Sequence, residues 1–208
     1  MPTPDGTPPT RIGVFGGTFD PIHHGHLAMA EECRAVLDLD LVLFMPAGQP
    51  PHKRGRKIAP VADRVAMVEL AIASNPFFRL SRVDVDRVGP SYTVGSLEAL
   101  RLEWGPEARF WFLMGADSLA DVLTWREPAR LIELCRVVAV NRPDAPPPDP
   151  SRLERALPGA SARIDVVEMP AMAISSTDLR ARVAAGRPIK YQVPEAVERY
   201  ILEHGLYR

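Results

Sequence analysis

Residues 16–26 read Gly-Gly-Thr-Phe-Asp-Pro-Ile-His-His-Gly-His. The segment follows a short apolar run at 12–15 and precedes a helical pattern from Leu27, which predicts a strand that turns tightly into a helix. Glycines at such a turn permit positive φ angles and let a ligand approach the main chain closely. The first amides of a helix are unpaired and favour phosphate. His23 and His26 add donors that can carry positive charge near neutral pH. The segment therefore predicts a phosphate site.

Two other interpretations fit parts of this segment. Two glycines after a strand often form only a turn, and a single histidine often fills partly buried surface. Three imidazoles in four residues also suit a metal ion, because imidazole is a common ligand. No thiolate cluster and no His-Glu-x-x-His spacing accompanies them, and ligand count and spacing decide such sites. We therefore expect no metal held by protein side chains alone.

The composition is typical of a globular protein with one core. Of its residues, 46% are apolar and 25% are charged. A length of 208 residues is too short for two ordinary enzyme domains. The formal net charge is −1, so no overall positive field attracts nucleic acid. No run reaches the roughly 18 apolar residues of a membrane span. We expect a cytoplasmic enzyme with neither a nucleic acid nor a membrane as partner.

The ends of the chain and its cysteines add little chemistry. Residues 1–10 are rich in proline and threonine and lack the apolar stretch of a secretory signal, so we expect a flexible lead-in. Residues 11–208 are expected to form one domain with a small helical part at about 174–208. Cys33 and Cys135 lie in apolar contexts, which favours buried reduced thiols over a disulfide.

Apolar runs alternate with helical patterns along the chain. Strands are predicted at 12–15, 41–45, 78–85, 110–114, 137–140 and 164–169, and helices at 27–37, 62–73, 94–102, 175–185 and 194–204, with a broken helical region over 118–134. Continuous apolar strands indicate burial on both faces of a parallel sheet. The alternation predicts a doubly wound α/β fold with ligands at the carboxyl ends of the strands. The proline-rich stretch 145–150 is expected as an exposed loop.

Two motifs together resemble a known superfamily. Gly17-Thr18-Phe19-Asp20-Pro21, followed by His23-x-Gly25-His26, resembles the signature of the nucleotidylyltransferases. Near the C-terminus, Ile174-Ser175-Ser176-Thr177-Asp178-Leu179-Arg180 resembles their second motif, here in the form Ile-Ser-Ser-Thr-x-x-Arg. The resemblance implies a Rossmann-like nucleotidylyltransferase fold. It also implies transfer of a nucleoside monophosphate from a triphosphate to an acceptor, with release of pyrophosphate.

The resemblance assigns roles to both motifs. It implies catalytic roles at the phosphates for His23, His26 and Arg180, and ATP binding by Gly16, Gly17, Thr18, Phe19, Ile174, Ser176 and Thr177. Such transfer to a phosphate acceptor needs no covalent protein nucleophile, so positioning and charge neutralisation do the catalysis. The alternative for the second motif is a helix capped by Ser175, with Arg180 merely on its surface.

Three further segments resemble one branch, the nicotinate-mononucleotide adenylyltransferases. They are Pro50-Pro51-His52-Lys53, Ser91-Tyr92-Thr93, and Gly115-Ala116-Asp117-Ser118-Leu119 with Trp125 following. The resemblance places Lys53 at the ATP phosphates, although a basic loop is most often simply solvated. It places Tyr92, Thr93, Asp117 and Trp125 around the acceptor.

The chemistry of these acceptor residues is suitable. Trp125 can stack on a flat pyridine ring, Thr93 at a helix start can bind the nicotinate carboxylate, and Asp117 can accept from ribose hydroxyls. The alternatives are a tryptophan of the core and an aspartate that caps the next helix. Gly95 and Ser96 depart from the branch pattern, which leaves the outer face of their helix without an assigned role.

The function implied is transfer of AMP from ATP to nicotinate mononucleotide, giving deamido-NAD and pyrophosphate. Mg²⁺ would bridge the triphosphate oxygens, held by phosphates and water. The rivals are a sister enzyme that uses another phosphorylated acceptor such as phosphopantetheine, a cytidylyltransferase, and a nucleotide-sensing regulator without turnover. Assembly as a homo-oligomer and the preference for nicotinate over nicotinamide stay open.

Overall fold

The computed structural model describes residues 6–49, 58–141, 148–170 and 172–208. In these ranges six strands form one sheet in the order β3-β2-β1-β4-β5-β6, and every pairing of neighbours is parallel. The strands are β1 (Arg11–Gly17), β2 (Leu41–Pro46), β3 (Phe78–Leu80), β4 (Arg109–Gly115), β5 (Arg136–Asn141) and β6 (Ile164–Glu168). The doubly wound parallel α/β fold predicted from the sequence is confirmed.

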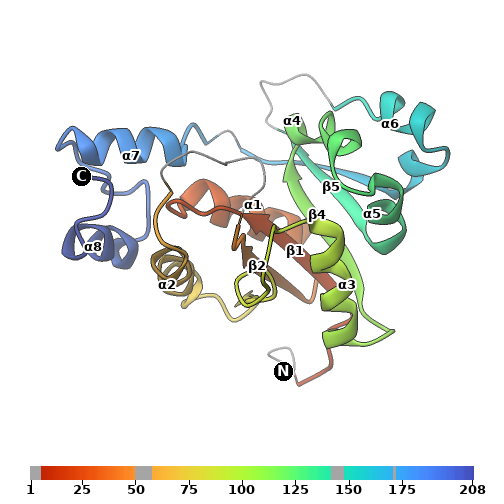
Figure 1. Ribbon diagram of the computed structural model, residues 1–208, viewed down its shortest axis with the longest axis horizontal. Helices are drawn as coiled ribbons and strands as arrows, with labels where there is room; N and C mark the ends of the chain where they lie inside the picture. Colours follow the sequence, from red (N-terminus) through yellow and green to blue (C-terminus); the bar gives the residue numbers. More distant parts are fainter. Residues whose placement is uncertain (1–5, 50–57, 142–147, 171) are drawn as a thin grey trace.

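Helices cover both faces of the sheet. They are α1 (His24–Val36), α2 (Val61–Ile72), α3 (Thr93–Trp104), α4 (Ala116–Leu119), α5 (Pro128–Leu134), α6 (Ser151–Ala156), α7 (Ser176–Ala184) and α8 (Glu195–Glu203), with 3₁₀ turns η2 (Val122–Thr124) and η3 (Ala160–Arg163). Figure 1 shows α7 and α8 at one end of the molecule, beyond α2, and α5 and α6 at the other end.

The central strands are buried on both faces because their successive side chains enter two different cores. In β2, Val42 and Phe44 pack into the core formed with α1, α2, α7 and α8, whereas Leu41 and Leu43 pack into the core formed with α3 to α6. Such alternation is the geometry of a strand, whose neighbouring side chains point to opposite faces. The continuous apolar runs in the sequence follow from it.

Two parts of the chain differ from the sequence prediction. The strand predicted at 78–85 ends at Leu80, because the chain turns at Arg82, whose carbonyl accepts from the amides of Val85 and Asp86 at 2.9 Å. The short helix α6 and the turn η3 were not predicted at all. The expected loop 145–150 lies outside the described residues up to position 147.

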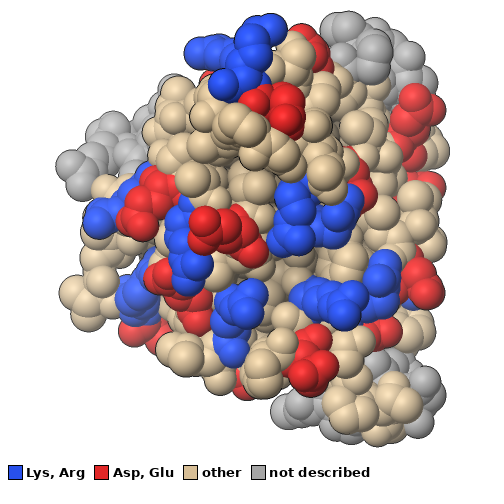
Figure 2. All heavy atoms as spheres, turned by 90° about the vertical axis from the view of Figure 1, so that its right-hand side faces the viewer, with Lys and Arg blue, Asp and Glu red and all other residues tan. Residues whose placement is uncertain are grey.

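The charged side chains on one face of the molecule and the two cysteines are placed as the composition predicts. On the end of the molecule at the right of Figure 1, lysine and arginine side chains are interspersed with aspartate and glutamate (Figure 2). Cys33 and Cys135 are both buried and free, as expected. In the ranges described, no helix combines the length and apolarity needed to cross a bilayer.

Candidate active site

Two pockets open at the carboxyl edge of the sheet, on either side of the end of β1. The larger, of about 610 Å³, is lined by the starts of α1, α4 and α7, including His23, His26, Asp117 and Ser176. The smaller, of about 230 Å³, lies toward β2. Strand order reverses at β1, between β2 and β4, and such a switch point is where doubly wound folds bind ligands.

The glycines of the first motif serve close packing rather than a positive φ. Gly16 and Gly17 are the last residues of β1, and neither has a positive φ. The positive φ of this turn, 48°, belongs to Phe19. A Cβ on Gly17 would come within 2.9 Å of the Phe19 ring, and one on Gly16 within 3.2 Å of the Phe112 ring. Neither glycine therefore uses the positive φ that glycine permits, and both instead let aromatic side chains pack close to the main chain.

His23 and His26 form a stacked pair at the start of α1. Their ring centroids lie 3.7 Å apart with an interplanar angle of 21°. The backbone amide of His23 donates to Nδ1 of His26 at 3.3 Å, which leaves the proton of a neutral His26 ring on Nε2. Nδ1 of His23 is buried and has no hydrogen-bond partner in the described part of the chain. Both rings line the larger pocket.

The environment of His23 favours its neutral form. Burial, with a smaller contribution from neighbouring His24, lowers the pKa of His23 from its ordinary value of 6.5 to about 4. His23 therefore does not carry the positive charge near neutral pH that the ordinary pKa of histidine would allow. A neutral imidazole still offers one N–H donor to a phosphate oxygen.

This lowered pKa makes the stability of the protein depend on pH. Between pH 6.5 and about 4 the unfolded chain binds a proton at position 23 that the folded protein does not bind, so stability is complete above that window and falls as the pH falls through it. From pH 7.5 to 4.5 we expect His23 to contribute a loss of about 2–3 kcal/mol in the free energy of unfolding.

Urea unfolding of wild type and His23→Asn at both pH values measures that contribution. Asparagine is a good N-cap residue and should keep the start of α1. The variant should lose less stability than wild type on acidification, by the stated amount. Equal losses in the two proteins would show that His23 is not the group that titrates.

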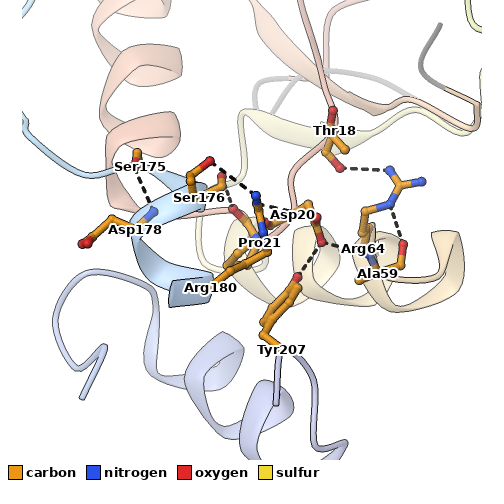
Figure 3. A network of polar contacts seen from close by, with 11 residues as sticks. Thr18, Asp20, Pro21, Ala59, Arg64, Ser175, Ser176, Asp178, Arg180 and Tyr207 are labelled. Atoms are coloured by element: carbon orange, nitrogen blue, oxygen red, sulfur yellow. Dashed lines mark hydrogen bonds and ion pairs between the residues drawn. The ribbon is translucent and has the colours of Figure 1, made fainter. Parts of the chain in front are cut away.

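The second motif forms the start of α7 and contacts the first motif. Ser175 is the N-cap, and its hydroxyl accepts from the amide of Asp178 at 3.1 Å. Ser176 Oγ donates to the carbonyl of Pro21 at 2.9 Å. Arg180 donates to the carbonyl of Asp20 at 2.7 Å (Figure 3). Ser175 is thus a helix cap, as the alternative interpretation predicts. Ser176 and Arg180 instead form hydrogen bonds that connect the second motif to the first.

The other ATP-binding candidates that the structure describes lie near this edge of the sheet. Ile174 and Ser176 line the larger pocket, and Thr177 Oγ1 accepts from Arg180 at 3.3 Å. Gly16, Gly17 and Thr18 line the smaller pocket instead, and Phe19 is buried beside His26, with ring centroids 5.2 Å apart. Lys53 lies outside the described residues.

The acceptor candidates divide between the two pockets. Tyr92, Thr93 and Trp125 line the smaller pocket together, and the Trp125 ring meets Phe112 edge-on at 5.8 Å. Thr93 is the first residue of α3, so the pocket contains a helix start. Asp117 instead lines the larger pocket with the histidines. Its Oδ1 accepts from the amide of Ser118 at 3.0 Å.

The departure at Gly95 and Ser96 does not concern an outer helix face. Ser96 is fully buried, and its hydroxyl donates to the buried carboxylate of Asp84. A Cβ on Gly95 would contact the Arg87 guanidinium, which pairs with Asp84 at 3.1 Å. These residues therefore support the smaller pocket, which Asp84 lines.

Sequence reasoning missed two groups around the first motif. Arg64, at 2% exposure, donates to the carbonyls of Thr18 at 2.9 Å and Ala47 at 2.8 Å. Asp20, at 3% exposure, accepts from the hydroxyl of Tyr207 at 2.8 Å. The helical spacing of Arg64 to buried Met67, Val68 and Ala71 was a signal that its side chain points inward.

Comparison with known proteins identifies the family. The family model described as cytidylyltransferase-like matches residues 14–182. A probable nicotinate-nucleotide adenylyltransferase of Thermomicrobium roseum is 52% identical over 199 residues, covering 96% of this chain and 92% of the relative. One from Roseiflexus sp. is 52% identical over 197 residues, covering 95% and 98%. This chain belongs to the nicotinate-nucleotide adenylyltransferase family.

Solved structures agree on the fold of this nicotinate-nucleotide adenylyltransferase family. The Plasmodium falciparum nicotinic acid mononucleotide adenylyltransferase complexed with NaAD has a TM-score of 0.77 at 19% identity, covering 95% of this chain and 97% of that one. A putative nicotinate-nucleotide adenylyltransferase from Vibrio parahaemolyticus has a TM-score of 0.65 at 20% identity, covering 96% of both chains. The segment 14–182 that matches the family model contains both sequence motifs and residues that line both pockets.

Proposed function

We propose that this protein is a nicotinate-nucleotide adenylyltransferase. It transfers AMP from ATP to the 5′-phosphate of nicotinate mononucleotide, giving deamido-NAD and pyrophosphate. The observation that carries this proposal is the 52% identity to such relatives over nearly the whole chain. The two pockets beside β1 support it, because the reaction needs two nucleotides that meet at one phosphorus.

The larger pocket suits ATP. The starts of α1 and α7 both face it, and helix starts favour phosphate. His23 and His26 supply imidazole donors on the same side. Asp117, at the start of α4, would accept from a ribose hydroxyl. Arg180 would reach the β- and γ-phosphates from the first turns of α7, where its side chain is 30% exposed.

The smaller pocket suits the acceptor mononucleotide. Trp125 offers an aromatic surface to the pyridine ring, and Thr93 with the first amides of α3 would bind the carboxylate. Arg126 also lines this pocket, and its guanidinium lies 5.0 Å from the centroid of the Tyr92 ring. This positive group suits an acceptor that brings a carboxylate and a phosphate.

The transfer is an in-line displacement at the α-phosphorus of ATP. An oxygen of the acceptor phosphate forms a bond to that phosphorus, while the bond to the bridging oxygen of pyrophosphate breaks and its electron pair leaves with pyrophosphate. No proton has to be removed from an ionised phosphate. The protein therefore contributes position and donors: Nε2 of His26 to a non-bridging α-oxygen, His23 beside it, and Arg180 to the leaving group.

Mg²⁺ is expected to enter with ATP as part of the substrate. In the part of the chain that the structure describes, no group of three His, Cys, Asp or Glu side chains is arranged to hold a metal ion. This fits an ion coordinated by triphosphate oxygens and water, as is usual for Mg²⁺. Its chemistry there is to neutralise charge on the phosphates.

Pyrophosphate release from Mg·ATP with a panel of acceptors tests the function. We expect release with nicotinate mononucleotide, with deamido-NAD formed in equal amount. The panel also contains nicotinamide mononucleotide and phosphopantetheine, and CTP replaces ATP in a parallel series. Release only with phosphopantetheine, or only from CTP, would assign a sister enzyme. ATP binding without release from any acceptor would indicate a regulator.

A further inference from the structure

The carboxylate of Asp20 lies at the centre of a buried network between the two motifs. Its Oδ1 accepts from the hydroxyl of Tyr207 at 2.8 Å and from the amide of Ala59 at 3.2 Å. Its Oδ2 lies 3.6 Å from Nη1 of Arg180. Figure 3 shows Tyr207 reaching Asp20 from the C-terminal segment, and Arg180 reaching it from α7.

Arg180 lies beside the Asp20 carboxylate but is not closely paired with it. A buried carboxylate needs donors or positive charge to offset its lost hydration. Arg180 now donates to the backbone carbonyl of Asp20 at 2.7 Å and to Thr177 at 3.3 Å, while the carboxylate itself stays 3.6 Å away. Two donors from other elements, the Tyr207 hydroxyl and the Ala59 amide, already bind Oδ1 of this carboxylate. Arg180 is therefore not drawn into a close two-pronged pair with it.

The position and the protonation of the Tyr207 hydroxyl are both fixed by its surroundings. Tyr207 follows α8, where the amide of Leu206 donates to the carbonyl of Ile201 at 3.0 Å, and its ring packs against the core formed with α1, α2, α7 and α8. Burial and the adjacent Asp20 raise the pKa of Tyr207, so its proton stays in place as a hydrogen-bond donor at working pH.

We propose that Tyr207 is a positioning residue for ATP: its hydrogen bond to Asp20 keeps Arg180 available to the triphosphate. This inference rests on the proposed function. When Tyr207 cannot donate, the carboxylate attracts Arg180 more strongly, and ATP loses part of its cationic partner. The acceptor pocket contains none of these groups, so the acceptor should be unaffected.

Tyr207→Phe and the matched control Tyr200→Phe test this role. Tyr200 lies on α8 and donates to Asp63 at 2.8 Å, so the control removes the same hydroxyl and an equally short bond to an aspartate outside the motif. We expect Tyr207→Phe to raise the Kd and KM for ATP about tenfold, the size of one hydrogen bond to a charged group. The KM for nicotinate mononucleotide and the kcat at saturating ATP should stay within about twofold of the wild-type values, a change of less than about 0.5 kcal/mol.

The double variant with Asp20→Asn separates this role from simple loss of stability. A neutral side chain at position 20 does not attract Arg180, so adding Tyr207→Phe to Asp20→Asn should change the Kd for ATP by less than about twofold. Equal effects of Tyr207→Phe and Tyr200→Phe on the Kd for ATP would overturn the proposal. So would a lowered melting temperature with an unchanged Kd.

Direct ATP titration keeps the two proposals distinguishable. If wild type binds ATP and forms no product from any acceptor, the proposed function fails. The ratio of ATP affinities between the two tyrosine variants still decides the role of Tyr207, because that measurement needs no acceptor.

Discussion

His26→Ala lowers kcat by about 10²-fold or more, the usual size for one donor that acts on transition-state charge. The His26 ring stacks on His23 and accepts from its amide through Nδ1, so the imidazole orientation is fixed before the substrate arrives. A donor held in this way needs no reorganisation as charge develops on the α-phosphate. The KM for either nucleotide should change much less than kcat.

His24→Ala is the control for this prediction. His24 is the first residue of α1 and its backbone amide donates to the carbonyl of Gln192 at 3.0 Å, a bond that alanine keeps. Single-turnover assays with both nucleotides saturating measure the chemical step in each variant. A His26→Ala rate within a few-fold of that of His24→Ala would remove His26 from the catalytic role.

The sheet and the two motifs were predictable because their signals are local. A strand buried on both faces is apolar at every position, as β2 and most of β4 are, and this pattern needs no knowledge of distant residues. Ser175 was recognisable as an N-cap from its spacing to Asp178. Such signals specify elements and their ends.

The contacts between the motifs and the rest of the chain were not predictable in the same way. Asp20 and Tyr207 are 187 positions apart, and no periodicity relates a loop to a C-terminal segment. The division of the acceptor candidates is similar. Asp117 and Trp125 are close in sequence but line different pockets, because Asp117 lies in α4 whereas Trp125 follows the turn η2.

The strand predicted at 78–85 failed for a related reason. Its apolar residues suit a strand, but Asp84 within it is buried and has its partners on α3 and in the adjoining turn. Satisfying a buried carboxylate outweighs continuing an edge strand, because an unpaired buried charge costs several kcal/mol. The strand propensity of this segment is therefore overridden by the tertiary contacts that the Asp84 carboxylate needs.

Arg64→Met lowers the free energy of unfolding by about 3–5 kcal/mol, the range for removing one partner from a buried charged network. The guanidinium donates to the carbonyls of Ala59 at 3.1 Å and Thr18 at 2.9 Å (Figure 3). It also donates to the carbonyl of Ala47 at 2.8 Å. Methionine fills similar volume but donates no hydrogen bond. It leaves buried carbonyls unsatisfied at about 1–3 kcal/mol each.

The loss should extend to activity, because these carbonyls belong to the turn after β1 and to the end of β2. The hydrogen bonds of Arg64 hold both segments against α2. Without them, the part of the smaller pocket that Thr18 and Ala47 line should become less rigid. We therefore expect the KM for the acceptor to rise in the fraction that stays folded. Acceptor titrations below the melting transition measure this effect.

Arg82→Met is the matched control for Arg64→Met. Arg82 pairs with Asp86 at 2.9 Å, but its side chain is 51% exposed, and such surface pairs contribute only about 0–1 kcal/mol. Urea unfolding of both variants compares the same chemical change in a buried and an exposed setting. Similar losses in the two would mean that Arg64 does not hold the two segments, since its hydrogen bonds to the three carbonyls named above would then contribute no more than a solvated ion pair.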